Sequence, residues 1–93
     1  MDIGGAIKII RLKHKVSQQE LSKGIGITQG YLSLIEKGER EPGFDLIGRI
    51  ADMLRVPPQL VFILACHDEL KTKHYTKPLR NMMMLADDVL QAI

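Results

Sequence analysis

The side chains best suited to binding chemistry lie between residues 28 and 37. Helical spacing places Gln29, Ser33 and Lys37 on one face, with Gly30 beside them. Amides and hydroxyls donate and accept hydrogen bonds, and a lysine ammonium attracts anions. Since no Ser/His/Asp or Cys/His arrangement occurs in a supporting motif, these groups predict a binding surface, and we expect no enzyme activity.

Two short helices joined through a glycine turn are expected to position this polar face. Ser17 and Glu20 have the spacing of a capping box, which predicts the start of the first helix. Gly26 stands where a tight corner between two helices needs a positive φ angle. Thr28 is the expected N-cap of the second helix, and Gly38 is expected to end it.

Apolar residues recur at helical spacing along most of the remaining chain. They predict helices from Ile3 to about Lys15, over 46–54, and from Gln59 to about Asp68. Polar residues 69–77 predict a linker, and an amphipathic helix is expected over 78–93. We therefore predict an all-α protein.

Composition and charge agree with one small helical domain. The chain has 93 residues, 45% of them hydrophobic and 26% charged, and it contains no tryptophan, so the core should be aliphatic. Residues 8–40 contain seven basic and three acidic side chains, a net charge of +4, whereas residues 41–93 have a net charge of −1. The positive half is the half that contains the polar face.

Several other classes of protein are not expected. A single cysteine, Cys66, allows no internal disulfide, and the longest apolar run, from Leu60 to Cys66, is far shorter than the ~20 residues of a membrane helix. No signal peptide is visible, which predicts a soluble intracellular protein. His14, His67 and His74 lack a close second ligand pair, so we expect no metal and no cofactor.

The ordered set of helix signals matches a known pattern at one consistent spacing. The matching positions are Ile7, Arg11, residues 17–21, Gly26, residues 31–38, Pro42 and residues 46–56. In this set the chain resembles the Cro/phage-repressor (XRE-like) family of helix-turn-helix domains. The resemblance covers residues 6–64, with the helix-turn-helix motif at 18–37, and leaves 65–93 as a C-terminal extension with a linker and an amphipathic helix.

The resemblance implies a five-helix, lambda-repressor-like domain whose third helix enters the major groove of double-stranded DNA. It also implies a homodimer on a two-fold symmetric operator. A glutamine amide can bond to adenine, and serine can bond either kind of base edge, whereas Leu34 can only touch a thymine methyl group. The positions expected to bind DNA are Gln18, Thr28, Gln29, Gly30, Tyr31, Ser33, Leu34, Lys37 and Arg40.

Arg11 and Glu36 match a second pair of the family, which the resemblance implies is a salt bridge between the first and third helices. Arg11 would then hold the reading helix on the domain. The alternative is that Arg11 contacts DNA directly. We favour the structural role, in which loss of one partner destabilises the domain.

The expected fifth helix is apolar on every side, which favours a dimer contact over a core closed by the C-terminal helix alone. The methionine-rich extension is expected to fold back, to join a dimer, or to bind a different protein. The residues expected at a dimer or partner interface are Leu60, Phe62, Ile63, Met82, Met83, Ala86 and Val89.

These features predict a cytoplasmic, dimeric transcriptional regulator, a repressor, encoded by a bacterium or phage. An alternative from another class is an antitoxin or other protein-interaction regulator. It would bind a partner protein through the fifth or C-terminal helix, and DNA binding would be secondary.

Overall fold

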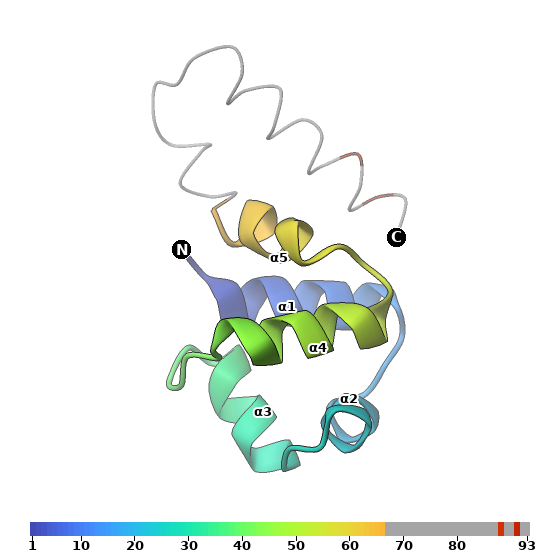
Figure 1. The fold of residues 1–93 in the computed structure, drawn as a ribbon, viewed down its shortest axis with the longest axis vertical. Coiled ribbons are helices and arrows are strands. Elements are labelled where there is room, and N and C mark those ends of the chain that lie inside the picture. The colour runs from blue at the N-terminus through green and yellow to red at the C-terminus, as the bar shows by residue number, and fades with distance from the viewer. Residues whose placement is uncertain (67–87, 89–90, 92–93) are drawn as a thin grey trace.

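The computed structural model describes residues 1–66 and, near the end of the chain, Asp88 and Gln91. In this part of the chain there are helices and no strands, which confirms the all-α prediction. α4 lies alongside α1, α5 covers one side of this pair, and α2 and α3 lie on the other side (Figure 1). The helices are α1 (Ile3–Lys13), α2 (Gln18–Ile25), α3 (Gln29–Glu36), α4 (Phe44–Leu54) and α5 (Pro58–Ala65).

The first and last of these helices are shorter than the apolar spacing predicted. α1 ends at Lys13 because Lys15 adopts a left-handed backbone with φ of 58°, which no helix can continue. α5 ends at Ala65, and Cys66 is its C-cap. The predicted helix over 78–93 lies outside the described residues, except for Asp88 and Gln91, which are both helical.

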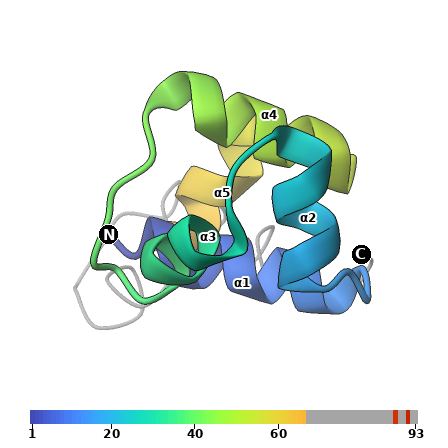
Figure 2. The ribbon, with the colours of Figure 1, turned by 90° about the horizontal axis from the view of Figure 1, so that it is seen from below.

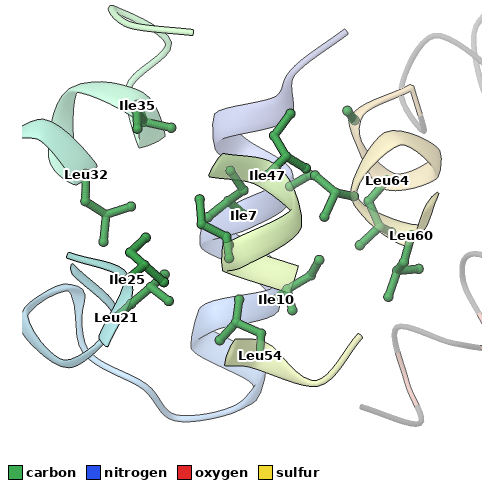
Figure 3. Packing of buried hydrophobic residues seen from close by; sticks show 14 residues of the cluster. Ile7, Ile10, Leu21, Ile25, Leu32, Ile35, Ile47, Leu54, Leu60 and Leu64 are labelled. Carbon is green, nitrogen blue, oxygen red and sulfur yellow. The ribbon is translucent and has the colours of Figure 1, made fainter. Parts of the chain in front are cut away.

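The core is aliphatic, as its composition predicted, and every helix contributes to it. Figure 3 shows Ile7 and Ile10 of α1 between the side chains of α2 and α3 on one side and those of α5 on the other. Isoleucine and leucine fill most of this space. The buried cluster consists of Ala6, Ile7, Ile10, Leu21, Ile25, Leu32, Ile35, Ile47, Ile50, Leu54, Leu60, Val61, Leu64 and Ala65.

α1 and α3 approach each other closely at Gly4. This glycine is buried, and a Cβ atom placed on it would overlap the carbonyl oxygen of Ile35 in α3. Only a residue without a side chain permits this approach. Gly4 therefore sets the distance between the first helix and the helix with the polar face.

α5 packs against α1 and α4 and buries Leu60 and Leu64 in the core of its own chain. This corrects the expectation that Leu60 contacts a partner, because a side chain that fills its own core has no surface to offer. Phe62 and Ile63 remain half-buried at the edge of the core. Met82, Met83, Ala86 and Val89 lie outside the described residues.

Candidate nucleic-acid interface

The predicted capping box is present at the start of α2. The Ser17 hydroxyl accepts a hydrogen bond from the Glu20 amide at 3.0 Å, and the Glu20 carboxylate accepts one from the Ser17 amide at 3.4 Å. Two amide groups at the helix start are thereby satisfied. The start of α2, and with it Gln18, is fixed by local side-chain chemistry.

The corner between α2 and α3 is built on a left-handed glycine, as predicted. Gly26 has a φ of 76°, and its amide donates to the carbonyl oxygen of Ser22, which also accepts from Ile27. Ser22 is buried at this corner. Arg49 of α4 donates to the carbonyl oxygen of Ile25, the last residue of α2. The corner is thus closed by its own backbone and tied to α4.

α3 begins at a side-chain cap and buries one face only. The Thr28 hydroxyl accepts from the Tyr31 amide at 3.0 Å, so the predicted cap is present. Leu32 and Ile35 are fully buried against the other helices. Figure 2, seen from below, shows α3 in front of α1 and joined to α2 by the short turn. The rest of α3 is left facing outward.

Four of the residues expected to bind DNA lie on this outward face of α3. Gln29, Gly30 and Lys37 are exposed, and Ser33 is half-buried between them. A Cβ on Gly30 would have nothing within 4 Å, so the domain itself does not require a glycine there. We call Gln29, Gly30, Ser33 and Lys37 the reading face.

The other expected DNA contacts surround the reading face. Thr28 is exposed at the start of α3, and Tyr31 and Leu34 are half-buried at its flanks. Arg40 is exposed in the loop after α3, where its amide donates to the carbonyl oxygen of Leu34 at 3.3 Å. Gly38, with φ of 79°, turns the chain into this loop. The structure therefore gathers these side chains around one helix.

Arg11 and Glu36 form a buried bidentate pair that fixes the end of α3 on α1. Nε of Arg11 lies 2.7 Å from Oε2 of Glu36, and Nη2 lies 2.9 Å from Oε1. Nη1 of Arg11 donates to the carbonyl oxygen of Val16 at 2.9 Å. Both side chains are more than nine-tenths buried. Such pairs specify geometry strongly, because losing one partner leaves a buried charge alone.

The side chain of Gln18 has a hydrogen-bond partner within the domain that the sequence pattern did not reveal. Its Nε2 donates to Oε1 of Glu36 at 3.0 Å, so the start of α2 is bonded to the end of α3. The other residues missed were Gly4 and Arg49. A glycine inside a predicted helix is a signal for close approach, but the bond from Arg49 to Ile25 has no signal in the sequence.

In the described part of the chain, no three histidine, cysteine or carboxylate side chains are grouped as metal ligands. His14 is half-buried just after α1, Cys66 is half-buried after α5, and His67 and His74 lie outside the described residues. None of the described helices has the length and apolar character needed to cross a membrane.

Known proteins with similar sequences are transcriptional regulators. An uncharacterised HTH-type transcriptional regulator of Mycobacterium tuberculosis is 36% identical over 62 residues, which are 67% of this chain and 44% of the relative. The transcriptional regulator ClgR of the same species is 31% identical over 66% of this chain and 54% of its own length. The chain thus spans about half the length of these relatives.

An archaeal relative is matched over most of its length. This uncharacterised HTH-type transcriptional regulator of Methanocaldococcus jannaschii is 32% identical over 57 residues, which are 61% of this chain and 86% of the relative. The helix-turn-helix family model matches residues 7–61, more than half of the chain and nearly all of the five-helix domain. The chain therefore belongs to the XRE-type helix-turn-helix family.

Proposed function

We propose that this protein is a DNA-binding transcriptional regulator that places α3 in the major groove of double-stranded DNA. The observation that supports the proposal best is the reading face, an exposed polar surface on a helix whose other side is fully buried. An α-helix fits the width of the major groove, where base edges present donors and acceptors. The cap at Thr28 and the pair between Arg11 and Glu36 hold this helix rigidly.

Gln29 and Ser33 are the proposed readers of base sequence. A glutamine amide can form two hydrogen bonds with adenine, and the serine hydroxyl can donate to or accept from a base edge. Leu34 is half-buried and offers only apolar contact with a thymine methyl group. Gly30 has no side chain, so at this position the backbone itself approaches the DNA.

Lys37 and Arg40 are the proposed phosphate contacts at one end of α3, and Thr28 is proposed at the other. Gln18 joins them, although its amide already bonds to Glu36. A side-chain amide has two N–H hydrogens, so one can bond to Glu36 while the other donates to a phosphate oxygen. Phosphate contacts of this kind set the position of the protein on DNA without reading its sequence.

We further propose that the protein binds as a homodimer on a two-fold symmetric operator and acts in the cytoplasm as a repressor. The edge of α5 around Ile63, which the core leaves half-exposed, is the proposed contact. Sedimentation at micromolar concentration should give about twice the 10.5 kDa of one chain. A mass near 10.5 kDa at this concentration would contradict the dimer.

The test begins with selection of bound duplexes from a random pool. On the selected site, Gln29→Ala should lose about 1–3 kcal/mol of discrimination at one base position in each half-site. Lys37→Ala should weaken binding to all duplex sequences similarly. It should also reduce the slope of log affinity against log salt concentration by about one. Arg55→Ala is the matched control, because Arg55 is an exposed cation in the α4–α5 connection, away from α3 (Figure 1).

Two outcomes would contradict the DNA proposal. The first is an affinity for duplexes that does not change with salt, because phosphate contacts always release counterions. The second is an equal loss in Lys37→Ala and Arg55→Ala, which would show that general charge and not the reading face determines binding. If no duplex is selected and a pull-down from the host retains a stoichiometric protein partner, the protein-interaction alternative is favoured.

A further inference from the structure

An open apolar pocket lies on the side of the domain where α1, α4 and α5 meet. Its volume is about 270 Å³, and Phe44 and Phe62 form one wall with their ring centroids 6.0 Å apart. Phe44 is 82% exposed, more than any other large apolar side chain in the described residues. The remaining lining comes from Met1, Ile3 and Ile47, and from Glu41, Pro42 and Gly43 of the α3–α4 loop.

An exposed aromatic side chain beside an apolar pocket indicates a surface that something covers. The reading face does not use this surface, since none of its four residues lines the pocket. The α3–α4 loop, through Pro42 and Gly43, forms the rim nearest α3. The pocket is therefore a separate feature of the domain.

The sequence beyond residue 66 contains one apolar stripe of suitable size. Leu79, Met82, Ala86, Val89 and Ile93 follow one another at spacings of three and four residues. Asp88 and Gln91, the described residues of this segment, are helical and exposed. At about 3.6 residues per turn they fall on the side opposite the stripe, as an amphipathic helix with a covered apolar side requires.

We propose that residues 79–93 dock in cis on the Phe44–Phe62 pocket, with the stripe filling it. The chain leaves the domain beside this pocket: the Asp2 amide donates to the carbonyl oxygen of Ala65 at 2.9 Å, which places the end of α5 next to the start of α1. Phe62 lies one turn before that end, and Met1 and Ile3 lie next to Asp2. The pocket is thus at the point from which the extension starts.

The length of the linker favours docking of the extension of the same chain in the pocket over docking of the extension of a second copy. Residues 67–78 separate α5 from the stripe, and twelve residues reach up to about 40 Å when extended, which allows the segment to return to the pocket. A linker of this length gives an effective concentration of about millimolar. A second copy at micromolar concentration cannot compete with this.

A tryptophan at position 44 provides the test, because the full chain has no other tryptophan. In Phe44→Trp, the docked stripe should shift the fluorescence to shorter wavelength and slow its quenching by acrylamide. Both effects should be lost when Met82→Lys and Val89→Lys are added, because two ammonium groups cannot enter an apolar pocket. Truncation after Lys77 in the same reporter should give the same loss without any change in the domain.

Two controls separate docking from general effects. Asp88→Lys and Gln91→Lys add two lysines to the opposite side of the stripe and should leave the fluorescence of the reporter unchanged. Leu12→Trp places the reporter at an exposed position on α1, outside the pocket lining, where none of the variants should change it. Circular dichroism of each variant checks that the domain remains helical.

The proposal is overturned if the fluorescence of Phe44→Trp is the same with the stripe intact, substituted or removed. It is also overturned if the Asp88→Lys, Gln91→Lys pair uncovers the reporter as strongly as the Met82→Lys, Val89→Lys pair. A protected signal that disappears between about 20 µM and about 0.2 µM would show that a second copy fills the pocket, which contradicts docking in cis.

Discussion

The pair α2–α3 and the pair α4–α5 are stabilised by different interactions. α2 and α3 begin at the side-chain caps of Ser17 and Thr28, and α3 ends at the buried partner of Arg11. α4 and α5 begin at Gly43 and Pro57, which form no side-chain cap, and they are held mainly by the aliphatic residues that they bury. Directional bonds therefore fix the helix that presents the reading face, while packing fixes the helices behind it.

This difference has a physical reason. Apolar packing depends on volume and area and tolerates small rotations of a helix. A hydrogen bond or bidentate ion pair loses most of its strength when its angles change. A helix that must match base edges needs defined angles, so the polar bonds gather where the proposed function requires accuracy.

The largest effect on stability should come from breaking the ion pair that holds α3. Arg11→Ala leaves the buried carboxylate of Glu36 without its cationic partner and should lower the free energy of unfolding by about 3–5 kcal/mol, measured by urea denaturation. Lys8→Ala removes an exposed cation from the same helix and should change it by less than about 0.5 kcal/mol.

A paired replacement sharpens this prediction. Arg11→Met combined with Glu36→Leu removes both charges and should recover part of the lost stability. If Arg11→Ala instead unfolds at the wild-type urea concentration but no longer binds DNA, Arg11 is a DNA contact and the structural role is wrong.

The next effect tests how closely α1 packs against α3. Gly4→Ala forces α1 away from the carbonyl oxygen of Ile35 and should cost about 1–3 kcal/mol of stability. Gly48→Ala is the matched control within α4, where a Cβ has nothing within 4 Å. It should stabilise the protein by up to about 1 kcal/mol, because alanine favours a helix more than glycine does. Equal effects of the two substitutions would contradict the close approach at Gly4.

The comparison also explains which features the sequence predicted. Local signals were sufficient for the capping box at Ser17, the left-handed Gly26 and the cap at Thr28, since each depends on residues a few positions apart. Apolar spacing predicted α1, α4 and α5 for the same reason. The pair of Arg11 with Glu36 is 25 positions apart in sequence, and only the family resemblance suggested it.

Features that depend on how distant helices meet were missed. Gly4 contacts the backbone of Ile35, and Arg49 bonds to Ile25, and neither contact has a periodic signal. The burial of Leu60 was misjudged because a helix that is apolar on all sides does not show which side faces its own core. The exposed Phe44 was missed because it precedes the apolar stripe over 46–54 from which this helix was predicted, whereas α4 begins at Phe44.

The smallest expected effect distinguishes a residue of the reading face from a residue of the helices behind it. Gly30 and Gly48 both lie in helices, and a Cβ on either has nothing within 4 Å. Gly30→Ala and Gly48→Ala should therefore both leave the domain folded, with a gain in stability of up to about 1 kcal/mol. Only Gly30→Ala should weaken binding to the selected duplex, because the added methyl group lies where the backbone of α3 approaches the DNA. Titration of both variants with one labelled duplex measures the difference. Wild-type affinity in both would place Gly30 outside the contact with DNA and would move the reading face toward Ser33 and Lys37.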